Sequence, residues 1–467
     1  MLPVGLIDND LQKRGQTIHG VPVVGNLHLL SGIAESLNIN KIIIALPEAT
    51  GPNIRQILAI SKDANLPVGI ISGSSEMSDA GTQNWRIRDV QIEDLLRNEP
   101  IQIDDDGLRR RVSRKRLLVT GAGGSIGSEL CRQLAQYDPA ELALLGHGEH
   151  SIFTLASEFA RLHPQLPVVR LIADVRDTNR LQRTFETFRP DIVFHAAAHK
   201  HVSLMEDNVE DAVTNNVLGT RNVIKASMAH GVEKFILIST DKAVNPTSVM
   251  GATKRIAELL VSEAARVSGR CYLSVRFGNV LSSRGSVLSI FREQIARGGP
   301  VTVTHPEMRR YFMTIEEAVN LVLQSMLLGR GGEIFVLDMG EPLKIADLAR
   351  DLIDLAGLKV GRDIDLEFTG MQPGEKLSEE LFLRRGHYER TEYEKIFVSF
   401  DGNGVEPEQE SCGNRAFDED LDKQIDALVD AARTGERPRI LQQLKRIVPE
   451  YQIDNGMATA PALLEMS

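Results

Sequence analysis

The sequence predicts an α/β protein with a Rossmann-type doubly wound parallel sheet, a C-terminal lobe and a smaller N-terminal α/β domain. Short apolar runs of strand length alternate with amphipathic helical patterns after residue 114, which is typical of a parallel sheet covered by helices. A glycine-rich turn joins the first of these strands to the first helix. The length of 467 residues leaves room for two or three domains.

The composition is that of a soluble globular protein, with 42% hydrophobic and 25% charged residues. The formal net charge of -11 argues against a nucleic-acid-binding protein, which usually needs a basic face. The sequence has no signal peptide and no apolar run of about 18 residues, so no segment of it is expected to span a membrane. Cys131, Cys271 and Cys412 are far apart, which indicates a reducing compartment, and Cys131 is expected in the core.

Residues 1–113 are expected to form the smaller domain. Residues 41–46 and 68–71 are strand patterns, residues 54–64 are a helical pattern, and residues 6–10 indicate a strand end and a turn. No glycine-rich phosphate loop precedes this strand end, so the domain is interpreted as a nucleotide-fold-like unit that is truncated at its start. The polar stretch 100–114, which includes a run of arginines, is predicted to be a solvated linker.

Residues 114–400 are expected to form the second domain. Its strands are predicted at residues 116–120, 142–145, 168–172, 192–194, 234–238 and 271–276, and its helices at 128–137, 178–188 and 219–229. From about residue 282 the pattern becomes less regular, which fits a substrate-binding lobe. Residues 401–467 are expected to hold a loose acidic loop at 401–414, helices, and a frayed tail from residue 455.

A phosphate-binding loop is predicted at Gly121, Gly124 and Gly127. Glycines allow a tight turn between strand and helix and bring backbone N–H groups close to a pyrophosphate. Because the motif follows a strand and opens a helix in an alternating series, it is interpreted as a dinucleotide site. Ser125 and Ile126 lie between the last two glycines and are predicted to contact the cofactor with them.

The choice between NAD and NADP stays open. Gly146 stands where an acidic residue usually binds the adenosine ribose, and Glu149 comes a few residues late. Asp174 and its neighbour Val175 follow the third strand of the domain. Asp174 is expected at the adenine edge of the cofactor, with a helix cap as the alternative.

A polar cluster follows the strand at residues 192–194. Its first part consists of three small residues that would let the backbone pass close to the nicotinamide: Ala196, Ala197 and Ala198. His199 and Lys200 come next and are expected to face the substrate, and the lack of partner ligands argues against zinc. Asn216 begins a helical pattern and is expected either to order the catalytic region or to act as a cap.

Asp241 and Lys242 come directly after the strand at residues 234–238. Doubly wound sheets place catalytic residues at this end of their strands. A neighbouring acid and amine can act as general acid and general base if burial and mutual charge tune their pKa values. A surface ion pair at a strand end is the alternative.

Together these motifs resemble the UDP-N-acetylglucosamine 4,6-dehydratases of polysaccharide biosynthesis, which are extended short-chain dehydrogenase/reductases. The resemblance spans about residues 115–400 and is carried by TGAGGSIGSEL at 120–130, HAAAHKHV at 195–202, STDKAVNP at 239–246 and VMGATK at 249–254, with HPEM, RYFMT and PGEKL further on. Residues 1–113 resemble the extra domain of the large subgroup.

The resemblance places Met250 and Lys254 where the superfamily carries a catalytic Tyr-x-x-x-Lys, and the large subgroup often has Met there. The spacing of four residues puts both side chains on one helix face. Lys254 is implied to hold the nicotinamide ribose. Since a thioether carries no proton at neutral pH, the proton of the C4 hydroxyl is expected to leave through an ordered water to Asp241 or to bulk solvent.

The implied reaction moves a hydride from C4 of the sugar to a tightly bound NAD or NADP, eliminates water from C5 and C6, and returns the hydride to C6. The cofactor is therefore regenerated in each cycle. The resemblance implies Lys242 as the base for the C5 proton and Asp241 as the acid for the C6 hydroxyl.

The resemblance also implies a UDP-sugar substrate. Asn279 is expected near its phosphates and Arg310 at the pyrophosphate, where a guanidinium suits phosphate oxygens, with Arg309 as the alternative. Glu375 is expected at the uridine ribose, unless it has a structural role in its loop.

The resemblance further implies a homo-oligomer, because the superfamily commonly pairs through a helix bundle. Full-length relatives carry membrane helices ahead of the corresponding region. A cytoplasmic location is expected, at the inner membrane if such helices precede this chain. No metal and no nucleic acid are expected as partners.

Two other functions stay open at this point. A nucleotide-sugar 4-epimerase would rotate a 4-keto intermediate, but such enzymes rely on Tyr-x-x-x-Lys and lack the Asp-Lys pair. A non-catalytic protein with a dehydrogenase fold would not need Asp241, Lys242 and Lys254 together.

Overall fold

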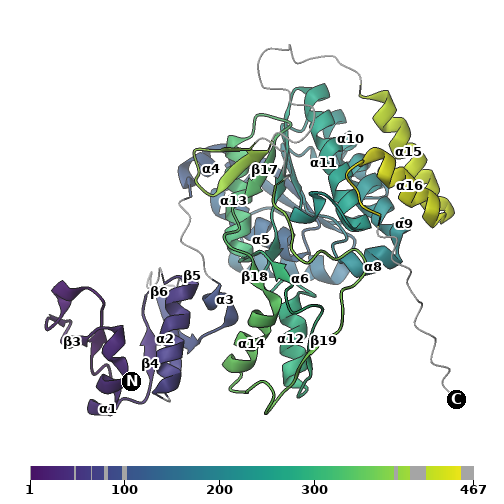
Figure 1. Cartoon of the computed structure of the whole chain (residues 1–467). Helices are drawn as coiled ribbons and strands as arrows, with labels where there is room; N and C mark the ends of the chain where they lie inside the picture. The colour runs from purple at the N-terminus through teal and green to yellow at the C-terminus, as the bar shows by residue number, and fades with distance from the viewer. Residues whose placement is uncertain are drawn as a thin grey trace. The chain divides into compact units, whose positions relative to one another are not determined.

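The computed structural model describes residues 2–46, 49–64, 66–77, 83–96, 103–382, 388–399 and 417–453. The chain, drawn in Figure 1, divides into two compact units. One unit comprises Met1–Ile101 with Arg350–Ile364, and the other comprises Gln102–Ala349 with Asp365–Ser467. Cys412, the predicted loop at 401–414 and the predicted tail from residue 455 lie outside the described residues.

The first unit holds two small sheets. The strands of one are β1 (Leu6–Ile7), β2 (Thr17–Ile18) and β3 (Val21–Gly25), and those of the other are β4 (Ile42–Ile44), β5 (Val68–Met77) and β6 (Gln83–Asp89). The helices are α1 (Leu30–Ser36), α2 (Gly51–Asp63) and α3 (Ile92–Leu95). The predicted strands near residues 6, 41 and 68 and the predicted helix at 54–64 are present. Buried Ile44, Ile54 and Ile70 supply apolar core to this unit.

A nine-stranded sheet organises the second unit. Its strands are β7 (Arg116–Thr120), β8 (Glu141–Gly146), β9 (Val168–Ile172), β10 (Ile192–His195), β11 (Lys234–Ile238), β12 (Cys271–Arg276), β17 (Ile334–Leu337), β20 (Tyr388–Arg390) and β21 (Ile396–Ser399). Their order is β20-β21-β17-β12-β11-β10-β7-β8-β9, and all except β21 run in the same direction. The strand order reverses between β7 and β10, where doubly wound folds open a crevice for a ligand.

Helices cover both faces of this sheet (Figure 1). Packed together on one face are α4 (Asp105–Val112), α5 (Ser125–Leu134) and α13 (Ile315–Leu328), and on the other α7 (Thr178–Phe188), α10 (Gly219–Ala229) and α11 (Val249–Ser268). The C-terminal helices α15 (Glu419–Thr434) and α16 (Arg437–Ile447) join the second group, so one apolar core includes side chains of α10, α11, α15 and α16. Cys131 is fully buried, as predicted.

The lobe that follows β12 along the chain is built from short elements. They are β13 (Asn279–Val280), α12 (Val287–Ala296), β14 (Val301–Val303), β15 (Arg309–Arg310), β16 (Phe312–Met313), β18 (Leu343–Lys344) and β19 (Leu366–Phe368). β13 pairs with β16 and β15 pairs with β18. The remaining helices of the chain are α6 (Glu149–Leu162), α8 (Val202–Asp207), α9 (Val209–Asp211) and α14 (Ile345–Leu355).

The predicted linker at 100–114 is wrong for its second half. Residues 105–112 form α4, which begins where the Asp104 side chain accepts a hydrogen bond from Gly107 N at 2.8 Å. Leu108 and Val112 are fully buried against the second unit, so this helix is part of it. The many charges of the stretch hid an apolar pair at i and i+4 on one helix face.

Candidate active site

The turn between β7 and α5 depends on the absence of side chains at two glycines. Gly121 has a φ of +66°, and a Cβ there would lie 2.7 Å from the backbone nitrogen of Ala197. A Cβ at Gly127 would lie 2.2 Å from the carbonyl oxygen of Gly121. The backbone of the loop therefore packs on the start of α5 and on the segment after β10, which is the arrangement that receives a dinucleotide pyrophosphate.

A cavity at the carboxyl ends of β7 to β10 brings together five of the predicted cofactor contacts: Gly121, Asp174, Val175, Ala197 and Ala198. Its lining residues are Gly121, Leu145, Gly146, His147, Ala173, Asp174, Val175, Ala197, Ala198, His199 and Asn215. Ala196 lies beside it, with its backbone nitrogen bonded to Thr120 O. Glycine and alanine dominate this surface, so these residues fit a flat ring system and a phosphate chain held by backbone groups.

Asp174 does not cap a helix. The cap of α7 is Asp177, whose side chain accepts a hydrogen bond from Arg180 N. Asp174 instead accepts from Arg176 N at 2.8 Å and pairs with its guanidinium at 2.7 Å, and these hydrogen bonds lower the pKa of its carboxyl group. The carboxylate therefore lines the cavity in its charged form.

Ser125 marks a contact that the sequence patterns did not indicate. Its Oγ accepts a hydrogen bond from Arg284 N at 3.1 Å, and the Arg284 guanidinium donates to Gly123 O at 3.0 Å. Arg284 thus brings the start of the lobe onto the glycine loop. It lies 159 residues along the chain from Ser125, so only the fold reveals this contact.

Gly127→Ala is expected to weaken cofactor binding. The added methyl group would overlap Gly121 O, and such overpacking costs about 1 to 3 kcal/mol, or roughly a 5- to 150-fold loss of affinity. Calorimetric titration of NAD and NADP into the purified chain would measure it. Gly32→Ala is the matched control, because a Cβ there meets no atom within 4 Å. Unchanged affinity in Gly127→Ala would contradict the placement of the cofactor at this loop.

Asp241 lies in the short turn that follows β11 and is fully buried. Its Oδ1 accepts hydrogen bonds from Thr240 Oγ1 at 2.9 Å and from Lys242 Nζ at 3.1 Å. Its Oδ2 is buried and has no hydrogen-bond partner among the described residues. A buried carboxylate oxygen without a partner costs stability, which is the usual mark of an atom kept for function.

Lys242 reaches three oxygen atoms that come from three separate segments. Its Nζ lies 3.1 Å from Asp241 Oδ1, 3.0 Å from Asn279 Oδ1 and 3.7 Å from Glu379 Oε1. Burial by itself would lower the pKa of this amine, but the charges of Asp241 and Glu379 outweigh burial and raise it above its ordinary value. The Lys242 amine is thus an ammonium at neutral pH. Asp241 is fully buried and the Lys242 side chain is only 18% exposed, so the pair does not lie at the surface, as the predicted alternative of a surface ion pair requires.

Met250 and Lys254 lie one turn apart near the start of α11. The helix begins where Ser248 Oγ accepts from Gly251 N at 3.1 Å. Met250 is only 3% exposed and packs in the apolar core. Lys254 is buried and donates to Ile238 O at 2.7 Å, and burial lowers the pKa of its amine to about 8, against the opposing charge of Glu258.

A buried ionic network ties α11 to the sheet beneath it. Both oxygens of Glu258 receive Arg276, at 2.8 and 2.7 Å, and the Glu258 carboxylate also accepts from Arg255 at 3.1 Å and from Ser239 Oγ at 2.6 Å. Ser239 lies two residues before Asp241, so this network positions the turn that carries Asp241 as well as the helix.

Asn216 orders the segment after β10 and does not cap a helix. It lies within the helical segment Ala212–Leu218 and is 1% exposed. Its Oδ1 accepts from His199 N at 2.8 Å, and its Nδ2 donates to His199 O at 3.0 Å and to Thr253 Oγ1 at 3.1 Å. The amide therefore orders the segment that carries His199 and Lys200, which was one of its two predicted roles. Lys200 itself donates to Ser283 Oγ of the lobe at 3.3 Å.

Three other predicted substrate contacts have partners within the protein. The Asn279 amide oxygen accepts from Lys242, and Arg310 donates to Arg309 O at 2.7 Å and lies 3.8 Å from Glu379. Glu375 accepts from Gln372 N at 2.9 Å, which is its predicted loop role. Arg310 is 7% exposed, and its contact with a pyrophosphate stays a prediction.

The structure also provides negative findings, each limited to the residues it describes. Over these residues, no group of three or more His, Cys, Asp or Glu side chains could hold a metal ion. In the same part of the chain, no helix is long and apolar enough to cross a membrane.

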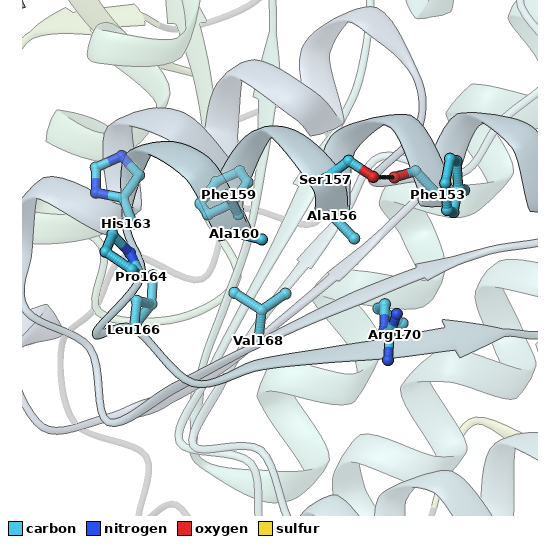
Figure 2. Close-up of a pocket in the computed structure, with 10 residues that line it drawn as sticks. All are labelled: Phe153, Ala156, Ser157, Phe159, Ala160, His163, Pro164, Leu166, Val168 and Arg170. Carbon is cyan, nitrogen blue, oxygen red and sulfur yellow. Dashed lines mark hydrogen bonds between the residues drawn. The ribbon is translucent and has the colours of Figure 1, made fainter.

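A larger cavity lies between α6 and β9, with a volume of about 400 Å³ (Figure 2). Its described lining is Phe153, Ala156, Ser157, Phe159, Ala160, His163, Pro164, Leu166, Val168 and Arg170. Figure 2 shows Ala156 and Ala160 of the helix facing Val168 of the strand, and Ser157 bonded to its own helix backbone. No carboxylate or amine lies in this lining, so it offers no acid–base pair for catalysis.

Comparisons with known proteins follow the division of the chain. A family model described as polysaccharide biosynthesis protein matches residues 117–400, and one described as CoA-binding domain matches residues 1–72. The protein named "Probable polysaccharide biosynthesis protein EpsC" from Bacillus subtilis is 46% identical over 399 residues. That match covers 85% of this chain and 67% of the relative, so the chain spans about two thirds of its length.

Relatives with named activities are more distant. A UDP-N-acetylglucosamine 4,6-dehydratase (inverting) from Campylobacter jejuni is 34% identical, over 61% of this chain and 83% of that protein. A UDP-glucose 4-epimerase from Rickettsia canadensis is 36% identical, over 57% of this chain and 77% of that protein. Among solved structures, that of Pen from Bacillus thuringiensis has a TM-score of 0.56 and 35% identity, covering 61% of this chain and 89% of that one.

Proposed function

The chain belongs to the polysaccharide biosynthesis protein family and is a nucleotide-sugar enzyme of the dehydratase and epimerase type, and we propose that it catalyses the 4,6-dehydration of UDP-N-acetylglucosamine. The observation that carries the proposal is the largely buried Asp241–Lys242 pair after β11, in which one carboxylate oxygen has no hydrogen-bond partner among the described residues. A dehydration needs both an acid and a base beside the sugar ring, and this pair provides both.

The glycine loop and the cavity beside it support a bound NAD or NADP, held by Gly121, Gly127, Ala197 and Ala198. When bound, the nicotinamide would accept a hydride from C4 of the sugar and return it at C6. Lys254, whose amine donates to Ile238 O at the end of β11, is proposed to hold the nicotinamide ribose.

The charge of Lys242 before the reaction sets the order of the proton transfers. The Lys242 ammonium has no lone pair, so it cannot take the C5 proton until it has lost one of its own. Its Nζ already lies 3.1 Å from Asp241 Oδ1, so a proton can pass along this hydrogen bond without movement of either side chain. The transfer produces a neutral amine and a carboxylic acid.

The elimination then restores the starting charges. The neutral Lys242 amine takes the C5 proton and becomes an ammonium again. The Asp241 carboxylic acid gives its proton to the C6 hydroxyl, which leaves as water, and Asp241 becomes a carboxylate again. Lys242 finally returns a proton to C5, and the proton released earlier from the C4 hydroxyl replaces it through solvent, so the cycle balances.

Met250→Tyr tests whether the C4 hydroxyl proton can leave without a protein base. Position 250 is only 3% exposed, so the larger phenol should overpack the core, lower the free energy of unfolding by about 1 to 3 kcal/mol, and bring no gain in kcat. Met250→Leu conserves the volume and should cost less than about 1.5 kcal/mol. Urea unfolding and steady-state kinetics would measure both variants, and a sharp rise in kcat for Met250→Tyr would contradict proton loss through water.

The proposal is tested by incubating the purified chain with UDP-N-acetylglucosamine and following the product by mass spectrometry. Loss of one water supports the dehydratase. An unchanged mass with inverted configuration at C4 would instead establish an epimerase, which is the activity named for the relative from Rickettsia canadensis.

A further inference from the structure

The segment at residues 373–380 is fastened to the turn that follows Asp241 and Lys242. Lys376 Nζ donates to Val244 O at 2.7 Å, and Thr247 Oγ1 donates to Gly374 O at 3.0 Å. Asn245, whose φ is +41°, donates through its side chain to Glu380 Oε2 at 2.8 Å. Three contacts therefore hold the two segments in register, and they fix the position of Glu379, which lies between Lys376 and Glu380 in the sequence.

Glu379 is the side chain that this register directs into the protein. Its side chain is 3% exposed, and its Oε1 lies 3.7 Å from Lys242 Nζ and 3.8 Å from Arg310 Nε. Its Oε2 is buried without a hydrogen-bond partner among the described residues. A buried carboxylate is costly unless charges compensate it, and here Lys242 and Arg310 do so from two sides.

The surroundings of the Lys242 amine suit its charged form. An ammonium has three N–H donors, and three oxygen atoms face it, from Asp241, Asn279 and Glu379. A neutral amine would direct a lone pair at one of these oxygens, which is repulsive. Each proton that Lys242 accepts is therefore stabilised by an acceptor that is already in place.

We propose that Glu379 is a positioning residue that acts through Lys242: it fixes the amine that takes the C5 proton between Asp241 and Asn279, and its charge favours the ammonium form. This inference rests on the proposed function, in which Lys242 takes that proton. The Glu379 carboxylate would stabilise the ammonium that forms in this step, and the proton transfer to Asp241 would supply the neutral amine before it.

Other charged groups near Lys242 set the background against which Glu379 acts. Asp241 and Glu379 raise the pKa of the Lys242 amine, whereas burial and the charge of Arg310 lower it. The neighbouring amines of Lys200 and Lys376 also interact unfavourably with Lys242, and Glu380 faces Lys376. Tyr311 faces Asp241 from the lobe. Among these groups, Glu379 is the carboxylate that can be neutralised without altering the Asp241–Lys242 pair itself.

The test compares Glu379→Gln with the wild-type full chain. The amide keeps the shape and removes the charge, so the pKa of Lys242 should fall by about one to three pH units. Competitive acetylation of Lys242 at a series of pH values, followed by peptide mass spectrometry, measures this pKa whether or not the chain turns over. Exposed Lys225 in the same sample is the internal reference.

Kinetics give the second measurement. With UDP-N-acetylglucosamine, kcat of Glu379→Gln should fall roughly tenfold, and the limb of its pH profile that reports Lys242 should move to lower pH. Glu379→Asp, which keeps the charge, should restore part of both effects. Glu367→Gln makes the same charge change at an exposed position of β19 and should change neither.

The outcomes separate this inference from the proposed function. An unchanged acetylation pKa of Lys242 in a folded Glu379→Gln chain overturns the inference, even if the wild type dehydrates its substrate. If Glu379→Gln does not fold, Glu379→Ala takes its place, and an unchanged pKa of Lys242 in that folded variant overturns the inference as well. Absence of dehydration by the wild type overturns the proposed function alone, because the acetylation pKa still decides the role of Glu379.

Discussion

Asp241→Asn should lower kcat of the dehydration by about 10²- to 10⁴-fold, the range that general acid–base groups contribute. The amide has the same shape as the carboxylate, so the contacts with Thr240 and Lys242 can partly remain. It cannot accept the proton of Lys242, and it cannot protonate the C6 hydroxyl. Both proton transfers of the proposed elimination are therefore lost in one substitution.

Single-turnover kinetics with saturating UDP-N-acetylglucosamine would measure the effect, with cofactor content checked on the same sample. Asp365→Asn is the matched control, because Asp365 is exposed and lies outside the site. If Asp241→Asn kept more than about a tenth of the wild-type kcat, an effect far below that range, Asp241 would not be the acid.

Glu258→Ala should lower the free energy of unfolding by about 3 to 5 kcal/mol. Removal of the carboxylate leaves Arg276, which is 1% exposed, as a buried charge without its main partner. It also removes the acceptor to which Ser239 and Arg255 donate hydrogen bonds. Equilibrium urea unfolding at neutral pH would measure the loss.

An exposed ion pair provides the control for Glu258→Ala. Glu293 pairs with Arg297 on α12, and both side chains are more than half exposed, so Glu293→Ala should cost only about 0 to 1 kcal/mol. A similar small loss for Glu258→Ala would contradict the view that this network holds α11 on the sheet.

The pKa of Glu258 determines the pH range in which its carboxylate contributes to the free energy of unfolding. Burial would raise the pKa of this carboxyl group, but the charges of Arg276 and Arg255 outweigh burial and lower it from 4.5 to about 2. A lowered folded pKa means that the stabilisation is complete above the unfolded value and is lost as pH falls through the folded value. The difference between wild type and Glu258→Ala should therefore shrink from about pH 5 towards pH 2.

Local patterns in the sequence were sufficient for much of the large sheet. The strands β7, β9, β11 and β12 and the helices α7 and α10 have the predicted residue ranges. Buried parallel strands are continuous apolar runs that turn residues interrupt, so their ends are marked in the sequence. α4 was missed because its buried face has only two apolar positions among charged neighbours.

The candidate site likewise has residues that local patterns could predict and contacts that they could not. Gly121, Asp241, Lys242 and Lys254 could be singled out because each lies next to a strand end or in a local motif. The partners of Lys242 could not be predicted in this way, because Asn279 and Glu379 lie 37 and 137 residues further along the chain. Arg310 was assigned to a phosphate by resemblance, and its approach to Glu379 at 3.8 Å could not be predicted because it depends on the packing of the lobe.

The central claim is that one buried acid–amine pair removes water between a hydride loss at C4 and a hydride return at C6. Its most direct test uses UDP-N-acetylglucosamine deuterated at C4, incubated with the full chain and cofactor, with the product examined by mass spectrometry and NMR. The account predicts a product that has lost one water and carries the deuterium on C6. Deuterium retained at C4, with no loss of water, would contradict it.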